Sequence, residues 1–292
     1  MKIFRKILFY TSLAIGVVLI TLIVAVFLYK DRIIRKFIEE ANKSLNTPIT
    51  IGKIDVSLFE DFPNLSIVFD DVYIEDSHPG KYPLLTAKRM SFNLNPIEVW
   101  KDIYVIRGLE ITGSETTLKI DGSGKNNYTV LKDSSATGGS AISLELKNIN
   151  LNQTRFHYKD VRTFLDLDFT GSRLTASIQS DRNIYTIEAT GDVTVEKLQV
   201  DKTTSLLKNK TFEVESNLIY DDNELSLMIQ PSTLELHQAA FAAHGSYRWK
   251  DKSLIDLYCD GKDTDIQTLT SLLPENISAK LNQYQSKGAV YF

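Results

Sequence analysis

The residue patterns that could carry chemistry in this sequence are a glycine-rich turn, two neighbouring carboxylates and one cysteine. The stretch 122–127, GSGKNN, lacks the Ser or Thr that follows the lysine of a phosphate-binding loop, so we interpret it as a hairpin turn. Asp166 and Asp168 stand two positions apart in a predicted strand, where both point to the solvent-facing side. Cys259 has no second cysteine to pair with and lies in a strand pattern. None of these patterns predicts catalysis.

Metal and cofactor sites are not predicted either. The histidines are scattered along the chain without the spacing of zinc ligands, at His78, His157, His237 and His244. The Gly-x-Ser-x-Gly motif that exposes a nucleophilic serine does not occur. We therefore expect that the protein is not an enzyme and that it uses no cofactor and no metal.

The charge distribution makes a nucleic-acid partner improbable. The chain has 33 Lys and Arg against 37 Asp and Glu. Residues 1–36 hold seven of the basic and one of the acidic residues, which leaves 26 basic against 36 acidic residues, a net charge of −10, for the rest. Phosphate binding needs a basic surface. We predict no nucleic-acid partner for this acidic body.

A long apolar segment lies near the N-terminus. From Ile7 to Tyr29 the chain reads ILFYTSLAIGVVLITLIVAVFLY, 23 residues without a charge. A helix of this length extends about 35 Å, enough to cross a hydrocarbon core of about 30 Å. The segment is longer than the core of a cleaved signal and lacks an Ala-x-Ala-like site. We predict that residues 1–30 are an uncleaved transmembrane signal-anchor, whose flanking charges leave its orientation undecided.

From Ile49 onward, apolar and polar residues alternate in short runs separated by turn signals. The alternation predicts a mainly β fold of antiparallel strands, either an open groove or a closed sandwich, with one or two short capping helices. Strands of this kind bury one face and expose the other to water. The candidate residues of an apolar groove face are Leu165, Leu167, Phe169, Leu225, Leu227 and Ile229.

The chain divides into two β-rich units. Residues 31–131 form the first predicted unit, which opens with an amphipathic helix and contains a second helix starting at Asn95-Pro96. The amphipathic helix either caps the sheet or lies at the membrane surface; its apolar positions are Ile34, Phe37, Ile38, Ala41 and Leu45. Residues 132–141, KDSSATGGSA, are typical of a linker.

The second predicted unit covers residues 142–292. Its stretch 265–283 is expected to be helical, with a break at Pro274. The final residues 288–292 have the pattern of a strand that has just begun. We therefore expect the chain to be part of a longer protein.

The order of these elements resembles the AsmA family of bacterial envelope proteins, in particular AsmA-like proteins of the Bacteroidetes type. The likeness begins where the anchor and amphipathic helix are followed by ITIGKIDVSLFEDFPNLSIVFDDVYIED, residues 49–76. It continues through residues 83–131 to a turn of the Asp-x-x-Gly-x-x-Asn-aromatic type, formed by Asp121, Gly124, Asn127 and Tyr128. Many relatives have Trp where this chain has Tyr128. The closing segment has Pro274, Tyr284 and Gly288 at the expected places.

The resemblance implies an inner-membrane protein with a cytoplasmic N-terminus and a periplasmic β-rich body. It also implies that the sheet of this body is long and curved. Larger relatives, the TamB-like and chorein-like bridge proteins, are linked to phospholipid movement toward the outer membrane and to outer-membrane assembly. We therefore expect a non-enzymatic protein of outer-membrane biogenesis that guides phospholipids along an apolar groove. Two alternatives stay open: a scaffold with a closed core that binds envelope proteins and affects their targeting, and an enzyme acting on envelope glycans or lipids.

Overall fold

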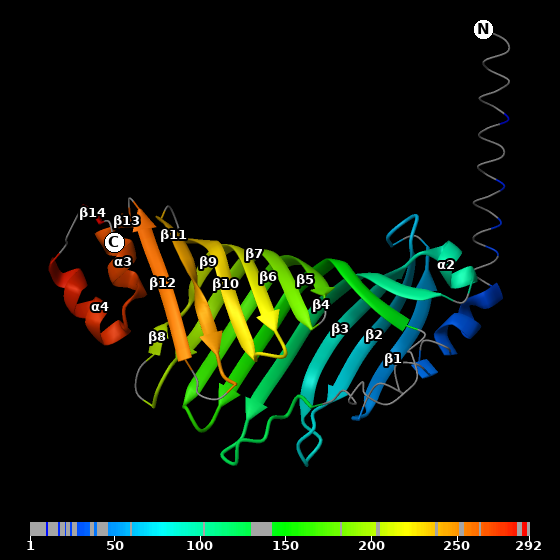
Figure 1. Ribbon diagram of the computed structural model, residues 1–292, viewed down its shortest axis with the longest axis horizontal. Helices are drawn as coiled ribbons and strands as arrows, with labels where there is room; N and C mark the ends of the chain where they lie inside the picture. Colours follow the sequence, from blue (N-terminus) through cyan, green and yellow to red (C-terminus); the bar gives the residue numbers. More distant parts are fainter. Residues whose placement is uncertain are drawn as a thin grey trace, which may run out of the picture.

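The protein is a mainly β structure in the computed structural model shown in Figure 1. The structure describes residues 10, 17, 21, 24, 28–35, 38–39, 46–58, 60–101, 103–129, 142–181, 183–202, 205–236, 239–250, 254–262, 264–284 and 288–290. The strands are β1 (Ile49–Ser57), β2 (Leu65–Glu75), β3 (Pro83–Leu94), β4 (Tyr104–Ile120), β5 (Ile142–Asp160), β6 (Leu165–Asp181), β7 (Ile184–Gln199), β8 (Ser205–Leu207), β9 (Lys210–Asp221), β10 (Ser226–Leu236), β11 (Ala239–Arg248), β12 (Leu254–Lys262), β13 (Thr264–Asp265) and β14 (Ala289–Val290). The helices are α2 (Pro96–Trp100), α3 (Ile266–Leu272), α4 (Glu275–Leu281) and the 3-10 turn η1 (Asn282–Tyr284).

One long sheet holds nearly all of these strands, in the order β1-β2-β3-β4-β5-β6-β7-β9-β10-β11-β12, with β8 added beside β7. Strands β13 and β14 form a separate two-stranded sheet. The strand order follows the sequence because most successive strands pair directly with one another. Figure 1 shows this long sheet curving from β1 at one end to β12 at the other.

The prediction of an all-antiparallel sheet is wrong at one place, since β4 and β5 run parallel. A parallel pair cannot be closed by a tight turn, and it needs a long crossover connection. The connection here is residues 121–141, of which 130–141, with the predicted linker 132–141, lie outside the described residues. Strands β4 and β5 pair from Tyr104 with Ile142 to Ile120 with Asp160, so the sheet is continuous across this connection.

Irregular positions interrupt the strand pairing at matching places. The register skips Gly52 and Asp71 between β1 and β2, and it skips Gly113 and Gln153 between β4 and β5. Three of these residues have positive φ: Asp71 at 55°, Gly113 at 63° and Gln153 at 52°. At these positions the regular ladder of paired residues is interrupted on both strands, without a shift of register.

The short helices begin and end as their sequences predict. Asn95 caps α2, and its Oδ1 accepts a hydrogen bond from the backbone N of Ile97 at 2.9 Å. Asp265 caps α3 by accepting from the backbone N of Gln267 at 2.8 Å and of Thr268 at 3.1 Å. The predicted break at Pro274 separates α3 from α4.

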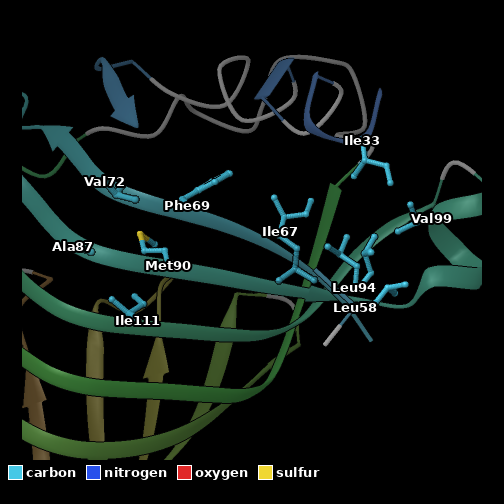
Figure 2. Close-up of a cluster of buried hydrophobic side chains, with 12 residues drawn as sticks. Ile33, Leu58, Ile67, Phe69, Val72, Ala87, Met90, Leu94, Val99 and Ile111 are labelled. Carbon is cyan, nitrogen blue, oxygen red and sulfur yellow. The ribbon is translucent and has the colours of Figure 1, made fainter. Parts of the chain in front are cut away.

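Buried apolar side chains form two clusters. The larger one lies on β1–β5 and also receives Ile33 from the N-terminal part and Val99 from α2. Figure 2 shows Phe69, Met90 and Ile111 of this cluster, from β2, β3 and β4, pointing to the same side of the sheet. The smaller cluster lies on β7 and β9–β11, with Leu269 and Leu272 of α3 packed against it. The two clusters occupy different parts of the long sheet.

The N-terminal part is described at a few positions only. Tyr10, Val17, Thr21, Val24 and residues 28–35 are helical, and most of the predicted anchor from Ile7 to Tyr29 lies outside the described residues. Within the described positions, no helix has the length and apolar character needed to cross a membrane. Ile33 and Ile38 pack on the larger cluster, which fits a helix that caps the sheet; Phe37, Ala41 and Leu45 are not described.

Candidate functional site

One face of the long sheet is apolar from the first strand to the last. Directly paired residues on neighbouring strands point to the same face. A single row of paired residues can therefore be followed across the sheet from β1 to β12. This row contains only apolar residues and glycine: Ile54, Phe69, Met90, Ile111, Leu151, Leu174, Gly191, Val214, Leu234, Phe241 and Gly261. We call the side of the sheet that carries this row the apolar face.

The adjacent row, on the opposite side of the sheet, is mostly polar. It runs through Asp55, Val68, Ser91, Glu110, Asn150, Thr175, Thr190, Glu215, Thr233, Ala242 and Asp260. Only Val68 and Ala242 are apolar in this row. We call this side the polar face. The sheet as a whole is thus amphipathic, although its strands come from distant parts of the chain.

The apolar face is buried near its ends and half-exposed in the middle. Phe69 and Met90 belong to the larger buried cluster, and Phe241 belongs to the smaller one. Between them, Leu151 and Leu174 are only partly covered. Among the described residues, no second sheet packs across this middle part, because the only other sheet is the two-stranded β13-β14 pair. This half-exposed apolar surface is the candidate functional site.

The structure brings five of the six predicted groove residues together on the apolar face. Leu167 and Phe169 of β6 pair with Tyr158 and Phe156 of β5, and Leu165 pairs with Asp160. On β10, Ile229 pairs with Leu218 of β9, which in turn pairs with Ile187 of β7. Ile187 pairs with Ile178 of β6, so the β6 and β10 candidates share one face; Leu227 lies there too, opposite Tyr220. All five are partly exposed.

Leu225 is the exception among the candidates. It lies in the turn before β10 and has a φ of 46°, so the strand pairing does not place it on either face. Its carbonyl accepts a hydrogen bond from the backbone N of Trp249 at 3.0 Å. The period-two pattern missed this turn because Leu225 continues the alternation of Leu227 and Ile229.

Hydrogen bonds hold the turn that contains Asp121, Gly124, Asn127 and Tyr128 in a defined shape. We call this turn the corner. Asp121 Oδ1 accepts hydrogen bonds from the backbone N of Ser123 at 2.8 Å and of Lys125 at 3.0 Å, and from Ser123 Oγ at 2.6 Å. These bonds lower the pKa of Asp121 from 3.8 to about 2, and the bond from Ser123 Oγ has the largest effect. Gly124 has a φ of 90°, which favours glycine at this position. Tyr128 lies just beyond the turn and is exposed.

Asn127 ties this corner to the connection between β2 and β3. Its side chain is 1% exposed, and its Oδ1 accepts from the backbone N of Lys119 at 2.7 Å. Its Nδ2 donates to the carbonyl of Thr117 at 3.0 Å and to Asp76 Oδ2 at 3.1 Å. Asp76 is itself buried and lies in the β2–β3 connection. The side chain of Asn127 therefore holds two neighbouring parts of the sheet rim in place.

The polar face carries a charged network on β5–β7. Arg155 donates two hydrogen bonds to Asp168, at 2.9 and 2.6 Å, and these bonds lower the pKa of the Asp168 carboxyl. Asp166 lies within 2.9 Å of His157 Nε2 and 2.6 Å of Lys197 Nζ. Burial opposes ionisation of Asp166, but the bonds from Lys197 and His157 outweigh it and lower its pKa. These carboxylates are therefore held as ion-pair partners on the face opposite the apolar one.

Cys259 is exposed on β12, and burial of part of its surface, together with the charge of Asp260, raises the pKa of its thiol. Groups of three or more metal-ligating side chains are not found in the part of the chain that the structure describes. The pairing of strands, rather than any chemical motif, defines the candidate site.

Sequence reasoning missed a charged pair at the rim of the apolar face, Asp160 with Arg162. A signal for it exists, since Asp160 takes the inward position of its strand, two residues after Tyr158, where an apolar residue is expected.

Comparison with known proteins does not identify a family for this chain. The chain matches no protein-family model, and no curated protein is similar to it at a significant level. The resemblance to AsmA-like proteins therefore stays a prediction.

Proposed function

We propose that this protein is a non-enzymatic, inner-membrane-anchored envelope protein that holds and guides the acyl chains of phospholipids on its apolar face, in support of outer-membrane biogenesis. The observation that carries the proposal is the unbroken apolar row from Ile54 to Gly261, which stays half-exposed at Leu151 and Leu174. A lipid chain needs a continuous apolar path of this kind.

The energetics favour an acyl chain as the occupant. Removing a CH2 group from water gains about 0.8 kcal/mol, so a chain that lies along several strands gains enough to leave water. The opposite, polar face carries the ion pair of Arg155 with Asp168 and remains hydrated. The anchor predicted from Ile7 to Tyr29 would hold the start of the sheet near a leaflet from which lipid enters. The periplasmic location of the body rests on the resemblance to AsmA-like proteins.

The proposal is tested by lipid analysis of the full-length protein after gentle detergent purification. We expect co-purified phospholipid by mass spectrometry. The change Leu174→Glu places a charge in the middle of the apolar row and should reduce the bound lipid severalfold. Thr175→Glu is the matched control, because the neighbouring residue points to the polar face. Lipid that is absent from the wild-type protein, or equal in both variants, contradicts the proposal.

A second candidate function, a scaffold for envelope proteins, is favoured by the edge strand β12. Its side chains are unusually apolar and exposed: Leu254, Ile255, Leu257 and Tyr258, with Ile255 70% exposed. Exposed apolar edge strands favour pairing with another strand. If this function dominates, Ile255→Lys should abolish recovery of a cross-linked protein partner while lipid content is unchanged. Loss of lipid without loss of a partner favours the first function.

A further inference from the structure

A charged pair lies at the rim of the apolar face, where β5 ends. Asp160 pairs with Ile120 of β4 and with Leu165 of β6, so it belongs to the apolar face, and it is 5% exposed. Arg162 donates to its carboxylate from the backbone N at 2.9 Å, from Nη2 at 3.0 Å and from Nε at 3.3 Å. Burial opposes ionisation of Asp160, but the bonds from Arg162 outweigh it and lower its pKa. Both groups are therefore charged at neutral pH.

One nitrogen of the guanidinium stays available. Arg162 Nη1 makes no hydrogen bond within the described part of the chain, and the side chain is 48% exposed. A Cβ at Gly124 would lie 3.0 Å from this nitrogen. The glycine therefore leaves space beside Nη1 that a larger residue would restrict.

Three tyrosines interact with this pair or with one another, and Tyr158 lies two residues before Asp160 on the same face of β5. Tyr158 lies on β5 and Tyr128 follows the turn after β4, and both interact electrostatically with Asp160, Arg162 and Tyr247. Tyr247 lies on β11, where its pairing with Leu227 of β10 places it on the apolar face. The three hydroxyls make no hydrogen bond among the described residues. Burial raises the pKa of Tyr158 to about 12, so its hydroxyl keeps its proton and can donate.

We propose that Asp160, Arg162, Tyr128, Tyr158 and Tyr247 bind the headgroup of a zwitterionic, amine-bearing phospholipid. We call these five residues the headgroup site. The aromatic faces of the tyrosines suit an ammonium group, and Arg162 Nη1 with the tyrosine hydroxyls suits the phosphate. Asp160 is buried and bonded to Arg162, so it holds the guanidinium in place. This inference rests on the proposed function, and it names the lipid class and the place where the headgroup lies.

The position and the local charge support this choice. Leu165 and Leu167 pair directly with Asp160 and Tyr158, so acyl chains attached to this headgroup would begin on the predicted groove residues. Asp121 also attracts Arg162, so two carboxylates act on one guanidinium. The excess negative charge disfavours a purely anionic headgroup and favours one that brings its own positive charge.

The test uses the full-length protein, purified in detergent and incubated with vesicles of equal amounts of phosphatidylethanolamine and phosphatidylglycerol with identical acyl chains. The bound lipids are then quantified by mass spectrometry. We expect the wild-type protein to prefer phosphatidylethanolamine about tenfold, the effect of one good charged hydrogen bond. Arg162→Gln and Tyr158→Phe should each move the ratio toward one while total bound lipid is retained.

Arg155→Gln is the matched control, because it removes an arginine paired to a carboxylate on the polar face, and it should keep the wild-type ratio. Tyr158→Phe removes one oxygen only, so it keeps the test decisive if Arg162→Gln fails to fold. Equal binding of both lipids by the wild type, or an unchanged ratio in Tyr158→Phe, overturns the headgroup site and leaves the proposed function standing. Binding of neither lipid overturns both.

Discussion

At the scale of single residues, Asn127 has the clearest structural role. Its amide makes three hydrogen bonds within the rim of the sheet, and it is almost completely buried. Asn127→Ala leaves the buried carboxylate of Asp76 and two backbone groups without these partners, so we expect a loss of about 2–4 kcal/mol in the free energy of unfolding. Urea unfolding followed by circular dichroism measures it. The exposed Asn150→Ala should change stability by less than about 0.5 kcal/mol.

Asp121 makes the same corner sensitive to acid. Its pKa is lowered from 3.8 to about 2 by hydrogen bonds that exist only in the folded turn. A lowered folded-state pKa means that its contribution to stability is present above pH 3.8 and is lost as the pH falls toward 2. We expect the unfolding midpoint to drop over this pH range. In Asp121→Asn the drop should be smaller, and an identical drop in both proteins would contradict the assignment.

Residue types on their own did not indicate where the candidate site lies. The alternation in TFLDLDF correctly placed Leu167 and Phe169 on one side of β6 and Asp166 and Asp168 on the other. The same rule failed at Leu225, where a turn interrupts the strand. It also missed Asp160 and Arg162, because Asp160 interrupts the apolar positions where β5 ends.

At the scale of secondary-structure elements, the bends in the strands depend on positions where a side chain does not fit. Gly191 of β7 has a φ of 137°, and a Cβ there would lie 2.1 Å from the carbonyl oxygen of Arg173. Gly191→Ala should therefore cost about 3 kcal/mol or more, from backbone strain and overpacking. A thermal melt measures the effect. Gly122→Ala, where a Cβ meets nothing within 4 Å, is the control that should melt near the wild type.

The strands could be predicted from the sequence, but their arrangement in space could not. Period-two patterns identify a strand without stating its direction, so the parallel pairing of β4 with β5 was not predicted. The long connection 121–141 was the available signal, because antiparallel neighbours are normally joined by short turns. The choice between an open groove and a closed sandwich depends on what packs against the apolar face, and alternation is the same in both.

At the scale of the whole molecule, the body needs to lie outside the cytoplasm for the proposed function. Cys259 is the single cysteine of the chain and is exposed on β12, so it reports on which side the body lies. We expect a thiol reagent that cannot cross the inner membrane to label it in intact spheroplasts. Because the thiolate is the reactive form and the pKa of the thiol is raised, labelling should speed up as the pH rises. Labelling only after lysis would place the body in the cytoplasm.

The central claim is that the apolar face, and not the polar face, meets lipid. Photo-crosslinking in living cells tests it most directly, with a benzophenone amino acid at Phe169 or Leu227 on the apolar face. Thr170 and Met228 are the control positions. Thr170 follows Phe169 on β6 and Met228 follows Leu227 on β10, so both point to the polar face. We expect phospholipid adducts from Phe169 and Leu227 and none above background from Thr170 and Met228. Adducts with protein neighbours alone, or equal lipid labelling from both faces, would contradict the account.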